Sequence, residues 1–272
     1  MKDNGAWRAY GVDFSGAREA GRKIWLGTGE AVDGTLYLDA CCPATALTGG
    51  DTGRRAALAA VRALITVCTA AAFGFDFPFA LPQALVPETC WVDFALGFGA
   101  RYPDVEAFRY ACREASGWRE LKRETDVAAR TPFSPYNLRI YRQTYYGIRD
   151  VLAPLVSSEA ISVVPMQPPR PDTTPVLEVC PASMLKRADR YRPYKGRRPE
   201  YRARRKELLD WLSGARDVVL VGKEIQRLVL DDGEGDALDA LLATVITFRA
   251  VMEGTRLTTD DEVARVEGYV FA

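Results

Sequence analysis

The chain has 272 residues, of which 48% are hydrophobic and 26% charged, and its 36 basic and 36 acidic side chains leave no formal net charge. This composition predicts one large domain or a core domain with a sizeable insertion, and it excludes a chain that binds polyanions over its whole surface. The chain has no histidine, which excludes serine–histidine and cysteine–histidine nucleophiles and histidine-bound zinc, so any catalysis needs carboxylates, lysine, tyrosine, cysteine or an oxygen-bound metal.

The first third of the chain has the pattern of a strand meander followed by a helix and a returning strand. Apolar runs predict strands over residues 7–14, 22–29 and 34–40, and the short turns between them favour antiparallel pairing. Apolar residues at helical spacing predict a helix over residues 51–70. The run AAFGFDFPF then predicts a fourth strand over residues 71–79.

A helical insertion or cap is predicted over residues 82–171. Up to residue 160 the sequence is helix-like and rich in arginine, tyrosine and tryptophan, without a clear strand. The proline-rich stretch 164–175 is expected to end the insertion as a stiff connector. The core domain would therefore comprise residues 1–81 and 172–272.

The core is predicted to resume with a fifth strand in VLEVCPA, residues 176–182. Helices are predicted over residues 199–213 and roughly 217–230, and a long helix over 236–253 follows the acidic segment DDGEGD. The final EGYVFA is expected to add a short edge strand. Together these elements predict an α/β fold with a mixed five-stranded sheet.

Carboxylates occupy unexpected positions in these elements. Asp13, Asp76 and Glu178 interrupt predicted strands, although ionised carboxylates are almost never buried unless they are paired or bound to a cation. Asp236 and Asp239 are three residues apart at the start of the long helix and so share one face, which continues as a stripe of small residues. Such a stripe lets the helix lie close to the sheet, so we expect these carboxylates to converge on one catalytic site.

A group of carboxylates repels itself unless some of them protonate or a cation neutralises them. Oxygen ligands without histidine or a thiolate pair favour Mg²⁺ or Mn²⁺. The candidate metal ligands are Asp13, Asp76, Asp236 and Asp239, and Glu178 would orient a water or complete the ligand set. Two such ions about 3.5–4 Å apart can activate a water and stabilise the leaving oxygen in phosphodiester hydrolysis.

Each carboxylate also has a simpler structural interpretation. Asp13 could cap the turn at Ser15-Gly16, and Asp76 could accept backbone hydrogen bonds at the end of its strand. Glu178 could pair with an arginine of the insertion. Asp236 is a natural N-cap or first-turn residue that complements the helix dipole. The sequence alone leaves these alternatives open.

A basic stretch, KRADRYRPYKGRRPEYRARRK, covers residues 186–206 and has eleven lysines and arginines against two acidic residues. Its interleaved tyrosines and arginines suit a phosphate backbone with unstacked bases. Lys195 is the expected contact to a substrate phosphate, supported by Arg197, Arg198 and Arg202. The alternative is a solvated helix face that follows a basic loop.

Several segments together resemble the predicted nucleases of RNase H-like fold known as domain of unknown function family 429. They are GVDFSGAR, GFDFPFALP, LEVCPASML, YKGRRPEYRARRKELLDWL and DALDALLAT, and their order covers most of the chain, with residues 90–160 the least matched. The resemblance implies three antiparallel strands followed by two parallel ones, flanked by helices. It also implies one metal site formed by Asp13, Asp76 and the Asp236/Asp239 pair, with Glu178 as the fourth member.

These observations favour a metal-dependent nuclease or phosphodiesterase that acts on RNA or DNA. One alternative is an actin-like nucleotide phosphotransferase or ATPase, for which Gly27-Thr28-Gly29 and Gly49-Gly50 are weak candidates for phosphate loops. Another is a nucleic-acid-binding module without catalysis. No apolar run reaches the roughly 18–20 residues of a membrane span, and MKDNGAWR has no apolar signal core, so we expect a cytoplasmic protein.

Overall fold

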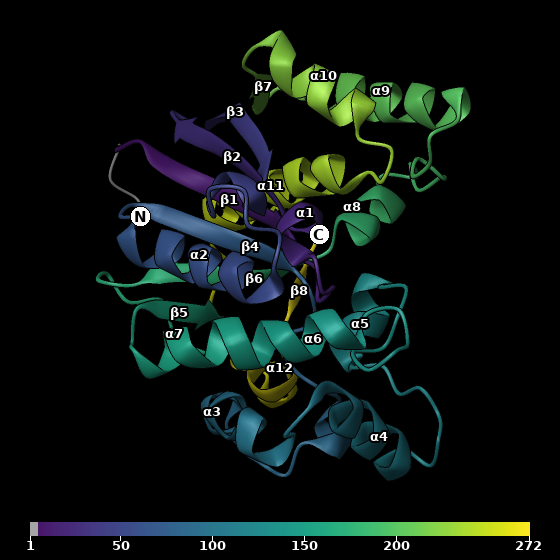
Figure 1. Ribbon diagram of the computed structural model, residues 1–272. Coiled ribbons are helices and arrows are strands. Elements are labelled where there is room, and N and C mark those ends of the chain that lie inside the picture. Colours follow the sequence, from purple (N-terminus) through teal and green to yellow (C-terminus); the bar gives the residue numbers. More distant parts are fainter. Residues whose placement is uncertain (1–4) are drawn as a thin grey trace.

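A mixed sheet of eight strands runs through the computed structural model, which describes residues 5–272 (Figure 1). The strands are β1 (Trp7–Asp13), β2 (Trp25–Val32), β3 (Thr35–Pro43), β4 (Ala71–Asp76), β5 (Ile161–Val164), β6 (Thr174–Val179), β7 (Val218–Leu220) and β8 (Val270–Phe271). Their order is β5-β6-β4-β1-β2-β3-β7, and β8 pairs with β6. The fold is therefore α/β with a mixed sheet, as expected.

The predicted meander and the two parallel strands that follow it form the centre of the sheet. β1 pairs antiparallel with β2, and β2 pairs antiparallel with β3. β4 lies parallel to β1, and β6 lies parallel to β4. The prediction of five strands is wrong in number, because β5, β7 and β8 extend this central group.

Two of the extra strands lie where the sequence predicted other structure. β5 falls within the predicted insertion 82–171 and pairs parallel with β6. β7 falls within the predicted helix 217–230, and only Lys223–Asp231 of that stretch is helical. Strands of three and four residues are too short to show a period of their own, so their pairing partners decide their conformation. β8 is the short strand predicted in EGYVFA.

The helices fill both sides of the sheet. They are α1 (Ala20–Lys23), α2 (Arg54–Val67), α3 (Trp91–Arg101), α4 (Val105–Ala115), α5 (Glu124–Ala129), α6 (Tyr141–Gly147), α7 (Ala153–Ser157), α8 (Pro181–Arg187), α9 (Pro199–Ser213), α10 (Lys223–Asp231), α11 (Asp236–Glu253) and α12 (Glu262–Glu267). The π-helical turn η3 (Ile148–Leu152) joins α6 to α7. The predicted bounds of α9 and α11 are confirmed.

Helix α11 lies against the glycine-rich face of the sheet, in contact with β1, β2 and β4. A Cβ at Gly11 or Gly27 would clash with the backbone of α11 near Ala240, and one at Gly74 would clash with Thr247. The stripe of small residues on the helix therefore meets glycines on three strands. This close approach brings the first turn of α11 to the carboxyl ends of β1 and β4.

The opposite face of the sheet is covered by α2 and by the insertion helices, which form the lower part of Figure 1. Phe73, Phe75 and Phe77 belong to the same hydrophobic cluster as Trp91 and Phe94 of α3. Because one cluster includes side chains of the sheet and of the insertion, the insertion is packed as part of the core. Among residues 5–272, no helix combines the length and the apolar character needed to span a membrane.

Candidate active site

Two of the predicted carboxylates lie side by side at the carboxyl end of the sheet. Asp13 is the last residue of β1 and Asp76 the last residue of β4, and the parallel register pairs them directly. Both line a cavity of about 490 Å³, as do Glu178, Lys195 and Asp239. The carboxyl ends of parallel strands are where α/β folds commonly place ligand sites.

The strand register determines which face of the sheet each carboxylate occupies. Side chains alternate between the two faces along a strand, so Asp13 and Asp76 share the face of Gly11 and Gly74, which lies against α11. Glu178 is paired with Phe75, one residue before Asp76, and therefore points to the opposite face.

Glu178 is held there by a fully buried arginine of the insertion. The two guanidinium NH₂ groups of Arg123 donate to the Glu178 carboxylate, one of them over 2.7 Å. Arg123 also donates to Asp126, and the backbone N–H of Phe79 donates to Glu178 over 2.9 Å. Glu178 thus has the arginine partner that the simpler interpretation proposed, and it lies at the cavity wall apart from the aspartates.

The first turn of α11 places Asp239 in the lining of the cavity, whereas Asp236 is not among the lining residues. Gly235, with φ of 82°, precedes the helix, and Asp232 caps it by accepting hydrogen bonds from the N–H groups of Ala237 (2.8 Å) and Glu234 (3.0 Å). Asp236 is therefore a first-turn residue rather than the cap. Its carboxylate and that of Asp239 instead meet a cation of the basic stretch.

That cation is Lys195. Its Nζ lies 2.7 Å from Asp239 Oδ2 and 3.6 Å from Asp236 Oδ1. The neighbouring Tyr194 donates its hydroxyl to the other oxygen of Asp239. The prediction that Lys195 belongs to the site is thus consistent with its position, although its partners here are carboxylates of the protein.

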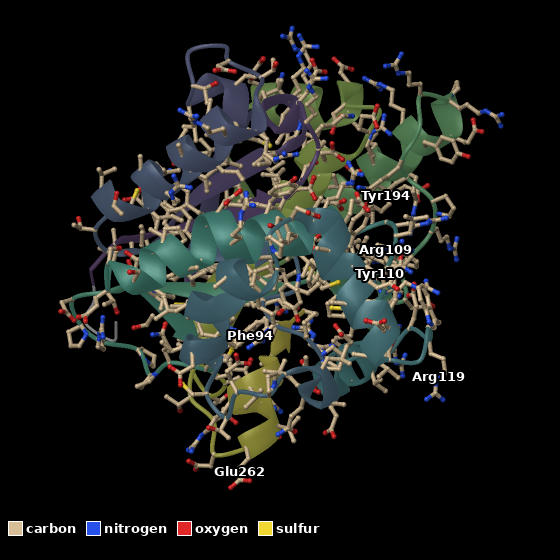
Figure 2. All side chains as sticks on the ribbon, turned by 60° about the horizontal axis from the view of Figure 1, so that its bottom comes forward. Phe94, Arg109, Tyr110, Arg119, Tyr194 and Glu262 are labelled. Atoms are coloured by element: carbon tan, nitrogen blue, oxygen red, sulfur yellow. The ribbon has the colours of Figure 1, made fainter. Side chains whose placement is uncertain are left out.

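The segment that carries Tyr194 and Lys195 is held by a buried arginine. Arg205 of α9 donates to the carbonyls of Tyr194 (2.7 Å) and Gly196 (3.0 Å). The N–H of Gly196 donates to the carbonyl of Gly233 over 2.7 Å, which ties the segment to the loop before α11. Tyr194, which belongs to this segment between α8 and α9, is labelled in Figure 2. Lys195 therefore extends from a fixed backbone.

The electrostatics of the aspartates reflect burial and crowding. Burial and the charge of Asp239 raise the pKa of Asp76 to about 8. Burial raises the pKa of Asp13 well above its usual range, with added repulsion from Asp239, Asp236 and Asp76, against the opposing charge of Lys195. Burial also raises the pKa of Asp236 to about 6. Crowded carboxylates of this kind are destabilised as anions unless a cation reaches them.

Within residues 5–272 the carboxylates of Asp13 and Asp76 have neither a hydrogen-bond donor nor an ion-pair partner, unlike Asp239. The simpler interpretations of both residues therefore fail in this part of the chain. The Ser15 hydroxyl, and not Asp13, accepts the N–H of Ala17 in the turn. The two carboxylates instead face the cavity.

The predicted arginines of the basic stretch lie outside this cavity. Arg198 forms an ion pair with Glu200 (3.7 Å) and Arg202 with Asp231 (3.3 Å), all at the surface, and the side chain of Arg197 packs beside Gly233. Their expected contact with a substrate at the carboxylates therefore lacks support from the geometry. These arginines instead form ion pairs or packing contacts with neighbouring residues, which agrees with the alternative of a solvated helix face that follows a basic loop.

The cavity is also lined by residues that were not predicted as site residues, apart from Tyr191, which is one of the tyrosines interleaved in the basic stretch. The insertion contributes Phe133 and Gln143, and the segment before Lys195 contributes Tyr191 and Arg192. The Gln143 side-chain amide donates to the Asp76 carbonyl over 3.3 Å. The patterns around Phe133 and Gln143 are ordinary helix and loop patterns, so only their position in the fold identifies them. Arg192 is adjacent to the predicted Lys195 segment and could have been found from that proximity.

A scan against protein-family models, a search of curated proteins and a search of solved structures each found no match for this chain. In the part of the chain that the structure describes, no three Asp, Glu, Cys or His side chains already form a ready ligand set for a metal. The interpretation of the site therefore depends on its own chemistry, beginning with the two carboxylates that lack partners.

Proposed function

We propose that this chain is a metal-dependent hydrolase of phosphodiesters whose substrate is a nucleic acid strand or a nucleotide. The observation that carries the proposal is the pairing of Asp13 with Asp76 at the ends of adjacent parallel strands, both facing a cavity without a partner. The resemblance to the RNase H-like nucleases of family 429 supports the same assignment by analogy only.

The donor set fits Mg²⁺ or Mn²⁺. Both ions prefer carboxylate oxygens. Asp13 and Asp76 offer four such oxygens, and among residues 5–272 no hydrogen-bond donor or ion-pair partner contacts them. Asp239 and Asp236 would complete the set from α11, where both carboxylates now contact Lys195. Such an ion, when bound, would supply the positive charge and the acidified water that phosphodiester hydrolysis needs.

Each remaining residue of the site has a separate proposed role. Asp13 and Asp76 hold the charge of the site at the sheet edge, and Tyr194 orients Asp239 by its hydrogen bond. Lys195 and Arg192 supply positive charge at the cavity wall, where a phosphate would enter. Glu178 acts indirectly, because its pairing with Arg123 fixes the insertion that forms the opposite wall.

The walls of the cavity favour an unpaired nucleotide over a duplex. A volume of about 490 Å³ lies in the range of small-molecule sites. Phe133 and Tyr191 line it, and aromatic side chains are the usual stacking partners of unstacked bases.

The test is Mn²⁺-dependent cleavage of single-stranded RNA and DNA by the purified protein. Asp13→Asn should abolish cleavage while the circular dichroism spectrum and the unfolding transition stay intact. The matched control is Asp93→Asn, which changes a carboxylate on α3, outside the cavity lining, and should leave the rate unchanged. Cleavage by Asp13→Asn at the rate of the unmodified protein would reject the assignment.

The two alternatives have less support from the geometry. Gly27 and Gly29 lie inside β2 and pack against α11 and β3, so they form no phosphate loop. A binding module without catalysis would bind nucleic acid in a salt-sensitive manner with no response to Mn²⁺. Binding measured with and without Mn²⁺ therefore separates that alternative from the proposed hydrolase.

A further inference from the structure

Lys195 occupies the point at which a cation is needed between the carboxylates of α11. Its ammonium bridges Asp239 at 2.7 Å and Asp236 at 3.6 Å. Asp239 is nearly fully buried, with a side chain 6% exposed, whereas the Lys195 side chain remains 51% exposed. The lysine side chain thus extends from the solvent-exposed edge of the site toward buried Asp239. Its ammonium can return to solvent if it dissociates from Asp239.

This position is fixed by the fold. Arg205 is 2% exposed and holds the carbonyls on both sides of Lys195, as described above. The Lys195 stem packs against Gly235, where a Cβ would lie 3.0 Å from Lys195 Cγ. Buried Arg205 and Gly235, which precedes α11, therefore hold the Lys195 side chain in place. The contact between the Lys195 ammonium and Asp239 is thus preorganised by the fold.

The charges around the lysine account for its stability there. Burial opposes its positive charge, but the carboxylates of Asp239, Asp13 and Asp236 outweigh that effect and raise the pKa of Lys195. A divalent cation would seek the same oxygens. An ammonium and a metal ion a few Å apart repel each other strongly, so the two cannot share Asp239 without cost.

We propose that Lys195 is an internal counter-ion that competes with the divalent metal for Asp239 and Asp236, so that metal binding displaces its ammonium toward the cavity. The inference rests on the proposed function, because it assumes that a divalent ion binds these carboxylates. The lysine lowers the affinity of the site for metal and keeps the carboxylates together when metal is absent. The displaced ammonium is then free to meet the phosphate of a substrate.

The experiment is calorimetric titration of the intact protein with Mn²⁺ after treatment with a chelator. Lys195→Met should tighten the Kd for Mn²⁺ by about tenfold or more, because a like charge a few Å from the ion is removed. Arg198→Met is the matched control, since Arg198 belongs to the same basic stretch but lies outside the cavity lining and pairs with Glu200 at the surface. It should change the Kd by less than about threefold, since a more distant charge is better screened.

A second readout keeps the test independent of activity and of one variant. Lys195→Gln should tighten the Kd in the same direction as Lys195→Met. In both variants, Mn²⁺ should raise the midpoint of thermal unfolding by more than it does in the unmodified protein. An unchanged or weaker Kd in folded Lys195→Met and Lys195→Gln would overturn the competition and leave the hydrolase proposal standing. Absence of Mn²⁺ binding in the unmodified protein would overturn both.

Discussion

The buried guanidinium of Arg123 offers a sharp test of how the insertion is attached to the sheet. It is fully buried and donates to Asp126 (2.8 and 2.9 Å), to Glu178 (2.7 Å) and to the Glu267 carbonyl (3.0 Å). It therefore joins the insertion to β6 and to the end of α12. Replacing it by methionine fills similar volume but leaves two buried carboxylates without their cation.

Breaking a buried ion pair by removing one partner costs about 3–5 kcal/mol. In a chain of this size each kcal/mol lowers the midpoint of thermal unfolding by about 2–4 °C, so Arg123→Met should lower it by about 10 °C. The loss should shrink at acidic pH, where Glu178 takes up a proton. Burial raises the pKa of Glu178. This carboxylate therefore becomes neutral on mild acidification, and a neutral carboxyl group no longer needs the missing cation.

The assay is thermal unfolding followed by circular dichroism at pH 7 and pH 5. The control is Arg119→Met, which removes an exposed arginine of the same insertion, seen at the periphery in Figure 2. The control should shift the midpoint by no more than about 2 °C, since exposed charges contribute little. A shift of that small size in Arg123→Met would refute the assignment of Arg123 as the link between insertion and sheet.

Two further predictions concern the aspartates and the glycine face. With metal removed by a chelator, the protein should lose stability as pH rises from about 4 to about 8, because folded Asp76 has its pKa raised to about 8 and still binds a proton that the unfolded chain has released. In urea unfolding, Asp76→Asn should make this slope shallower and be the more stable protein at pH 8, while the raised pKa values of Asp13 and Asp236 keep part of the slope; an unchanged slope would contradict the raised pKa of Asp76. Gly11→Ala should cost about 1–3 kcal/mol through its clash with α11, whereas Gly97→Ala, at an open position in α3, should be neutral or stabilising. Equal effects of the two substitutions would show that α11 can move away from the sheet.

The sequence predicted the centre of the fold because its signals there are local. The meander has alternating strands with short turns, and α11 has a long apolar pattern that starts directly after DDGEGD. By contrast, ISVV in β5 and VVL in β7 are short apolar runs whose strand pairing depends on distant partners. Short apolar runs of this kind are equally compatible with a strand and with part of a buried helix.

The candidate site was predictable in part for the same reason. Asp13 and Asp76 end strands that pair in register, and the shared face of Asp236 and Asp239 follows from helical spacing. Glu178 was placed with them because it also interrupts a strand, but its register with Phe75 turns it to the other face. Its partner Arg123 lies in an ordinary charged segment, LKRETD, so tertiary packing alone reveals that arginine as buried.

The most direct test of the central claim is the anomalous difference density of a crystal soaked in Mn²⁺. The account predicts a peak bound by oxygens of Asp13 and Asp76 together with Asp239 or Asp236. It also predicts that Lys195 Nζ has moved from its position 2.7 Å from Asp239 Oδ2. Absence of a peak at these carboxylates in a fully soaked crystal, with Lys195 still bound to Asp239, would contradict the claim that they form a divalent metal site.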